Sequence, residues 1–140
     1  MITRILLIDD DEDELGIFTD ALKAIGDFFK CTYATDAEQA LSILQVMQPD
    51  FIFVDYNLPK INGLEFISAA SKHIEPGVTR IFLYSTRINN DLVRTARLLG
   101  AAGCIEKSST IGELSRELKI ILDPRYSSPG PHQQGNNNGK

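Results

Sequence analysis

The chain has 140 residues, of which 43% are hydrophobic and 24% charged, a balance typical of one globular domain rather than of a disordered or fibrous chain. The net charge is −5, and the imbalance lies in one stretch, because residues 9–14 are all acidic and the rest of the chain is close to neutral. The chain has no stripe rich in Lys and Arg, which argues against a direct nucleic-acid partner.

The two cysteines, Cys31 and Cys104, are far apart in the sequence and form no metal-binding or redox motif. They indicate reduced thiols in a reducing compartment. The first residues do not have the pattern of a signal peptide, and no apolar run approaches the roughly 20 residues that span a bilayer. We therefore expect a cytoplasmic protein without a membrane partner.

Three short apolar runs, at residues 5–8, 51–54 and 81–84, contain no alternating polar residues. Strands of this kind are buried on both faces, which is typical of a parallel sheet covered by helices. Two weaker runs, at residues 31–34 and 103–105, predict a second and a fifth strand.

Apolar stripes spaced by three and four residues predict five helices between and after these strands, within residues 15–25, 37–47, 64–74, 92–99 and 111–121. Thr35, Asn62 and Thr110 each stand three residues before a Glu, which predicts the N-terminal caps of three of the helices. Because strand and helix alternate five times, the sequence predicts an open α/β sheet with helices on both faces.

The composition changes at the end of the chain. Residues 123–140 hold three of the six prolines, three of the ten glycines and one large apolar side chain, that of Tyr126. Such a segment cannot bury enough surface to offset the entropy of ordering it. We therefore expect one folded domain, residues 1–122, followed by a disordered tail, residues 123–140.

Polar residues follow the predicted strands at the edge where open α/β sheets bind ligands. They are two adjacent carboxylates, a third carboxylate, a hydroxyl and an ammonium, those of Asp9, Asp10, Asp55, Ser85 and Lys107. Crowded carboxylates repel one another, and a hard divalent cation such as Mg²⁺ removes that conflict. The ammonium and the hydroxyl suit an anion, so the set predicts that Asp55 acts as a nucleophile toward a phosphoryl group.

Four stretches, residues 5–10, 54–64, 83–86 and 100–107, carry these groups at the ends of the strands and in the same order as a known family. Over residues 1–122 the chain resembles the receiver domain of response regulators in two-component signalling, of the chemotaxis-regulator type. The resemblance implies a flavodoxin-like, doubly wound sheet of five parallel strands in the order 2-1-3-4-5 with five helices. It also implies an aspartyl phosphate and a bound Mg²⁺ ion.

Carried over by position, the resemblance implies that Asp55 is the phosphoacceptor. The implied metal ligands are three carboxylates and one backbone carbonyl, those of Asp9, Asp10, Asp55 and Asn57. The phosphoryl group itself is expected to contact the hydroxyl of Ser85, as a switch residue, and the ammonium of Lys107.

Two positions depart from the family pattern. Ser108 follows Lys107 where the family usually has a cis proline, and because a cis bond without proline costs about 2.5–4 kcal/mol, we expect a trans or strained bond there. Cys104 stands at the possible switch position, where an aromatic residue is common, and it is too small to replace a moving ring. Burial as a small core residue is its simpler interpretation. Tyr84 adjoins Ser85, but alternation along the strand points it to the other face.

The resemblance implies a response regulator rather than an enzyme, and because no DNA-binding or enzymatic domain follows residue 122, we expect it to stand alone. It would receive its phosphoryl group from a sensor histidine kinase or a histidine phosphotransfer protein and act on an unidentified target through protein–protein contacts. The fourth helix, fifth strand and fifth helix are the implied docking surface.

Two other functions share part of the pattern. A phosphatase of the haloacid-dehalogenase type also uses an aspartyl nucleophile and Mg²⁺, and Asp9 and Asp11 have its spacing, but Glu12 follows where Thr or Val is usual and Asp55 would have no role. A flavodoxin-like cofactor binder needs a phosphate loop after the first strand, where the acidic residues 9–14 would repel a phosphate.

Overall fold

The computed structural model describes residues 2–107 and 110–123, which form five strands and five helices in strict alternation. The strands are β1 Thr3–Ile8, β2 Phe29–Ala34, β3 Phe51–Asp55, β4 Arg80–Ser85 and β5 Gly103–Glu106. The helices are α1 Glu12–Ile25, α2 Ala37–Leu44, α3 Gly63–Ala70, α4 Asn90–Leu99 and α5 Ile111–Ile121. None of the described helices has the length and apolar character that crossing a membrane requires. From residue 124 on, the predicted tail lies outside the described residues.

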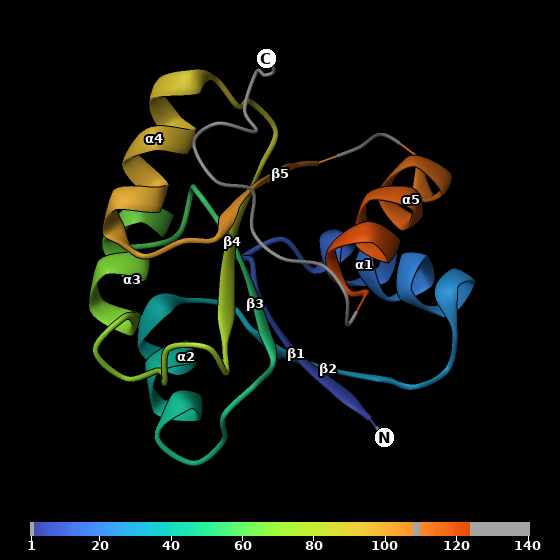
Figure 1. The fold of residues 1–140 in the computed structure, drawn as a ribbon, viewed down its shortest axis with the longest axis horizontal. Coiled ribbons are helices and arrows are strands. Elements are labelled where there is room, and N and C mark those ends of the chain that lie inside the picture. The colour runs from blue at the N-terminus through green and yellow to red at the C-terminus, as the bar shows by residue number, and fades with distance from the viewer. Residues whose placement is uncertain (1, 108–109, 124–140) are drawn as a thin grey trace.

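The strands form one parallel sheet in the order β2-β1-β3-β4-β5. Helices α2, α3 and α4 cover one face, and α1 and α5 pack against each other on the opposite face (Figure 1). The predicted fold class, including the strand order, is confirmed. β3 lies at the centre of the sheet, so its last residue stands in the middle of the carboxyl edge.

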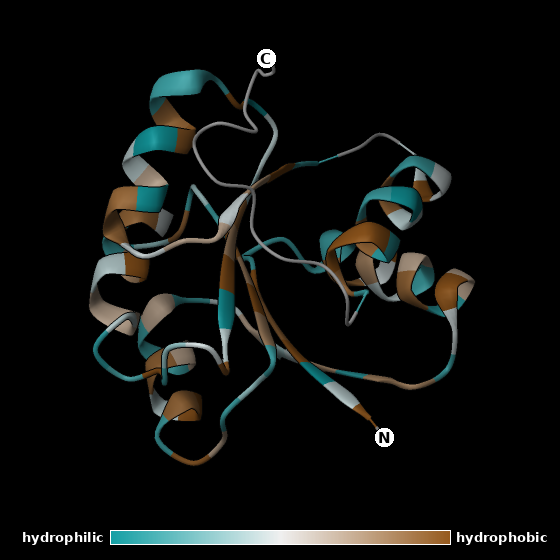
Figure 2. Cartoon of the chain, in the orientation of Figure 1, coloured by the Kyte–Doolittle hydropathy of each residue, from teal (hydrophilic) through white to brown (hydrophobic). Residues whose placement is uncertain are grey.

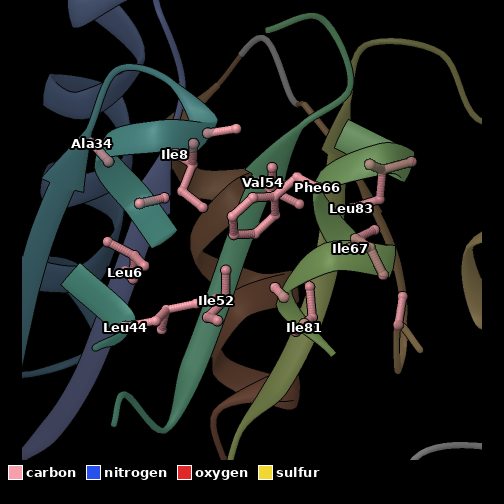
Figure 3. Packing of buried hydrophobic residues seen from close by; sticks show 14 of the residues in the cluster. Leu6, Ile8, Ala34, Leu44, Ile52, Val54, Phe66, Ile67, Ile81 and Leu83 are labelled. Carbon is pink, nitrogen blue, oxygen red and sulfur yellow. The ribbon is translucent and has the colours of Figure 1, made fainter. Parts of the chain in front are cut away.

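The core explains why the apolar runs do not alternate. All five residues of β3 are buried, because neighbouring side chains along the strand pack into different helical layers. Ile52 and Val54 pack with α2 and α3 (Figure 3), whereas Phe51 and Phe53 belong to the layer of α1 and α5. Figure 2 shows the consequence: the central strands are mostly hydrophobic, while the helices carry both hydrophobic and hydrophilic residues.

The helix caps confirm two of the three predicted N-termini. The side chains of Asn62 and Thr110 accept hydrogen bonds from the backbone at the starts of α3 and α5. The prediction for Thr35 is wrong, because Asp36 caps α2 and accepts from the backbone N–H of Gln39 at 2.8 Å. An ionised carboxylate accepts more strongly than a hydroxyl, and Thr35 instead donates its backbone N–H to the Gln39 side chain at 2.7 Å.

A close approach between α3 and the end of β3 sets the backbone geometry of the carboxyl edge. The backbone N–H of Gly63 donates to the carbonyl of Tyr56 at 2.7 Å. A Cβ atom at position 63 would overlap the backbone oxygen of Asp55 and lie 2.9 Å from Cδ1 of Leu83. Glycine therefore allows the helix to begin directly against the strand end that carries Asp55.

Candidate functional site

The parallel register brings the predicted site residues to one edge of the sheet. Ile8 pairs with Val54, so the next residues along the two strands, Asp9 and Asp55, are neighbours. Asp55 in turn pairs across to β4, whose last residue is Ser85. This is the edge that the sequence predicted, formed by the carboxyl ends of adjacent strands.

Three carboxylates form a cluster at this edge. Asp9, Asp10 and Asp55 each place an oxygen within 4.8 Å of the others, with Asp9 fully buried, Asp55 only 7% exposed and Asp10 exposed. Burial and, after it, the charge of Asp9 raise the pKa of Asp55, against the opposing effects of Lys107 and of the backbone N–H of Asn57. The ionised form of Asp55 is therefore destabilised by its surroundings.

Asp9 is held in place from several sides. Its Oδ1 accepts from the backbone N–H of Asp11 at 3.0 Å, and its carbonyl oxygen accepts from the Tyr33 hydroxyl at 2.6 Å. Its buried Oδ2 lies 2.8 Å from Nζ of Lys107, a close ion pair, but accepts no well-aligned hydrogen bond from the described residues. This oxygen keeps a lone pair free, and with the carboxylates of Asp10 and Asp55 it provides the hard oxygen donors that a divalent cation prefers.

Lys107 is the cation of the site. Its side chain is 10% exposed, and its Nζ lies 3.3 Å from Oδ1 of Asp55 in addition to its contact with Asp9. Burial acts to lower the pKa of this ammonium, but the adjacent carboxylates outweigh it and the net effect is to raise the pKa. Among the described residues, one ammonium and three carboxylates meet at this edge, so the edge is net negative, which fits a site that could hold a divalent metal ion.

Ser85 and Asn57 also lie at this edge. The groups that the sequence predicted to act, the Ser85 hydroxyl and the Asn57 backbone carbonyl, do not contact the three carboxylates in the described residues. The Ser85 hydroxyl is buried and donates to the carbonyl oxygen of Arg87 at 3.2 Å. Asn57 is exposed, and it is its backbone N–H that hydrogen-bonds to Asp55. The hydroxyl of Ser85 is thus directed to its own loop in this structure.

Cys104 lies on β5, paired with Leu83 across to β4, and packs against the hydrophobic cluster of the α2, α3 and α4 layer. Burial raises the pKa of its thiol to about 11, so that the thiol is neutral near pH 7. These surroundings fit a small core residue. Ser108, and with it the predicted geometry of the Lys107–Ser108 bond, lies outside the described residues.

Sequence reasoning missed the contact that Tyr84 makes with the site. Tyr84 is fully buried in the α1 and α5 layer, on the face that alternation predicted, but its ring also lies 5.3 Å from Nζ of Lys107. Its hydroxyl donates to Oε1 of Glu14 at 3.1 Å. The available signal was a tyrosine in a continuously apolar strand, because a buried phenol needs a polar partner.

A doubly wound parallel sheet with an acidic cluster and a lysine at its carboxyl edge defines a flavodoxin-like domain with an anion- and metal-compatible site. The chain belongs to the response regulator receiver domain family, since the family model matches residues 5–119. Receiver domains act in two-component signalling, in which a histidine kinase is the general partner.

Curated relatives carry this domain in proteins of different lengths. A probable chemotaxis protein CheY of Rhizobium etli is 25% identical over 119 residues, which cover 85% of this chain and 92% of that protein. The protein-glutamate methylesterase/protein-glutamine glutaminase 1 of Dechloromonas aromatica is 29% identical over 115 residues, which cover 82% of this chain but 33% of that protein. The chain therefore spans nearly all of one relative and about a third of the other.

Solved structures show the same fold. Chemotaxis response regulator CheY4 of Vibrio cholerae superposes with a TM-score of 0.74 at 23% identity, over 87% of this chain and all of that one. The Mn²⁺-bound form of response regulator Rcp1 gives a TM-score of 0.72 at 21% identity, over 91% of this chain and 99% of that one. At these identities the likeness supports the arrangement of strands and helices.

Proposed function

We propose that this chain is a stand-alone response regulator that receives a phosphoryl group on Asp55 from a sensor histidine kinase or a histidine phosphotransfer protein. The observation that carries the proposal is the setting of Asp55. It is a nearly buried carboxylate at the end of the central strand, with the carboxylate of Asp9 on one side and the ammonium of Lys107 3.3 Å away. We assign this activity to residues 1–122 and none to the tail, residues 123–140.

The transfer is a displacement at phosphorus. An oxygen of Asp55 forms a bond to phosphorus while the P–N bond of the donor phosphohistidine breaks, and the leaving imidazole takes up a proton. Lys107 stands where negative charge on the phosphoryl oxygens would gather, and its ammonium stabilises that charge in a site screened from water. Ser85 then exchanges its bond with the Arg87 carbonyl for one donated to a phosphoryl oxygen.

The same proposal includes a metal site. The expected ligands of Mg²⁺ are the carboxylates of Asp9, Asp10 and Asp55 and the backbone carbonyl of Asn57. A bound Mg²⁺ ion supplies positive charge that offsets the crowding of the carboxylates and of the phosphoryl oxygens. Response regulator Rcp1, which has the same fold, has been solved in an Mn²⁺-bound form.

Output passes through protein–protein contacts in the cytoplasm, without nucleic-acid binding and without an enzymatic activity of its own. The proposed docking surface comprises α4, β5 and α5. Leu98, which is 83% exposed on α4, and Ile120, which is 63% exposed on α5, give this surface apolar side chains that a protein partner could cover.

Incubation with acetyl phosphate and Mg²⁺, followed by intact-mass measurement, tests the acceptor. We expect the wild type to gain one phosphoryl group as acetate leaves, and Asp55→Asn to gain none because the amide is not a nucleophile of this kind. Asp20→Asn, which changes an exposed carboxylate on α1, is the matched control and should behave as the wild type. An adduct of equal size in Asp55→Asn would move the acceptor to another residue.

A further inference from the structure

Lys107 carries its charge on a flexible four-carbon side chain, yet the proposed transfer requires that charge at one place beside Asp55. The residue after it is Ser108, which does not restrict the backbone as a proline would. Side-chain contacts of the ammonium therefore have to fix its position. The described contacts come from three strands: Asp9 follows β1, Asp55 ends β3, and Tyr84 lies on β4.

We infer that Tyr84 is a positioning residue, whose ring holds the ammonium of Lys107 in place for the anion that Asp55 accepts. This inference rests on the proposed function. Its basis is the set of contacts around the ring of Tyr84.

The ring of Tyr84 is itself fixed on two sides. Its hydroxyl donates to Oε1 of Glu14, on the first turn of α1, at 3.1 Å. Its edge packs against Phe18 of the same helix, with ring centroids 5.8 Å apart and planes at 70°. Tyr84 is fully buried, so α1 and β4 together determine where the ring stands.

The contact between the ring and Lys107 is attractive and directional. An ammonium within about 6 Å of an aromatic centroid is drawn to the ring's negative face, more strongly when the ammonium is desolvated. Nζ of Lys107 lies 5.3 Å from the centroid, and the side chain is 10% exposed. A leucine at position 84 would keep an apolar side chain there but offer no such contact. A phenylalanine would keep the ring and lose only the bond to Glu14.

The test uses beryllofluoride as the phosphoryl mimic and measures its affinity with saturating Mg²⁺ by calorimetry, alongside the affinity for Mg²⁺ alone. We expect Tyr84→Leu to weaken beryllofluoride binding about tenfold, the order of a desolvated cation–π contact, and to change Mg²⁺ affinity less than about twofold. Tyr84→Phe should stay within about threefold of the wild type for both ligands.

A double-mutant cycle separates positioning from general stability. In the background of Lys107→Met, the change Tyr84→Leu should cause no further loss of beryllofluoride affinity, because the ammonium it acts through is gone. Additive losses, or equal losses in Tyr84→Phe and Tyr84→Leu, would overturn the inference. Failure of the wild type to bind beryllofluoride would instead contradict the proposed function.

One measurement needs no substitution. The ring current of Tyr84 should shift the ε-methylene protons of Lys107 upfield from their position in an exposed lysine, and NMR of the folded wild-type chain measures this shift. The shift should persist in Tyr84→Phe. Lysine methylene protons at the ordinary exposed position in the wild type would show that the ring does not hold the side chain, and would overturn the inference even if Tyr84→Leu does not fold.

Discussion

Two aspartates stand at opposite ends of β3 and have opposite surroundings: Asp50 immediately precedes the strand, and Asp55 is its last residue. Asp50, at the amino end, is partly buried; its side chain accepts from the backbone N–H of Arg4 at 2.9 Å, and its backbone oxygen accepts from Arg80 at 3.0 Å. Asp55, at the carboxyl end, faces other carboxylates. Asp50 connects neighbouring strands through hydrogen bonds that satisfy its acceptors. The surroundings of Asp55, in contrast, destabilise its ionised form. One residue type thus stabilises the sheet at one end of the strand, and at the other end it supplies the carboxylate that we propose as phosphoacceptor.

The largest effect should come from changing the tight packing beneath the carboxyl edge. In Gly63→Ala the new methyl group would overlap the Asp55 backbone, and we expect a loss of about 2–3 kcal/mol of unfolding free energy together with slower phosphorylation. Gly16→Ala is the control, since a Cβ there meets nothing within 4 Å, and it should gain about 0.5–1 kcal/mol from helix propensity. Urea denaturation of both variants checks this, and an unchanged Gly63→Ala would show that the edge is loosely packed.

The next effect concerns the proposed metal site at the carboxyl edge. Removing one ligand in Asp10→Asn should weaken Mg²⁺ binding about tenfold or more, equivalent to about 1.4 kcal/mol, as measured by calorimetry. Asp13→Asn is matched to it, because Asp13 is an exposed acid of the same stretch but outside the carboxylate cluster. Equal Mg²⁺ affinities in the two variants would show that the acidic stretch attracts Mg²⁺ through its overall charge and that Asp10 is not a ligand.

Removing the charge of Asp50 and removing that of Asp55 should change the unfolding free energy in opposite directions at neutral pH. Asp55→Asn removes the cost of burying the Asp55 charge and, after it, the repulsion by Asp9, so it should raise the unfolding free energy on the order of 1 kcal/mol. Asp50→Asn replaces a charged acceptor by a weaker neutral one and should lower it by about 0.5–1 kcal/mol. Denaturation curves at pH 7 measure both changes. If both substitutions raised, or both lowered, the unfolding free energy, the two aspartates would not differ as described.

The pH dependence sharpens the same comparison. The pKa of Asp55 in the folded chain is raised above its ordinary value of 3.8, which applies in the unfolded chain. Between the unfolded and the folded pKa of Asp55, the folded chain therefore binds more protons than the unfolded chain. The contribution of Asp55 to stability therefore falls as the pH rises through that window, and the deficit persists at neutral pH. The stabilisation by Asp55→Asn should shrink toward zero as the pH falls below about 4. A gain that stays constant down to pH 3 would have a cause other than charge.

The smallest effect should be local to the loop after β4. We expect beryllofluoride to change amide-hydrogen exchange over residues 85–95, because Ser85 would move from the Arg87 carbonyl to the bound anion. This change should survive Cys104→Ala, since Cys104 is a small core residue without a ring to rotate, and vanish in Ser85→Ala. If the exchange change survived Ser85→Ala and vanished in Cys104→Ala, Cys104 rather than Ser85 would link the bound anion to the loop.

The fold was predictable because its signals are local and redundant. Burial on both faces makes the strands continuously apolar, and one-sided burial gives the helices their stripes. The error at Thr35 shows the limit: two adjacent residues, Thr35 and Asp36, could both cap α2, and only the backbone geometry decides between them.

The sequence predicted those features of the site that follow from the positions of the strand ends. It did not predict those that depend on the conformations of individual side chains. Parallel strands bring Asp9, Asp55 and Lys107 to one edge whatever their rotamers. The direction of the Ser85 hydroxyl and the contact between Tyr84 and Lys107 depend on which way side chains turn after the backbone is fixed. Alternation along β4 placed the Tyr84 ring on the correct face, but it carries no information about a lysine that follows another strand.

The acidic stretch of residues 9–14 also acts beyond contact distance. It carries a charge of −6 beside the site in a chain whose total is −5, and most of it is exposed. Its field reaches roughly 10 Å at 0.1 M salt, which concentrates cations at the entrance and repels small phosphate donors. Added salt should therefore weaken the capture of Mg²⁺ while easing the approach of acetyl phosphate. A protein donor with a basic rim around its phosphohistidine would turn the same field into attraction.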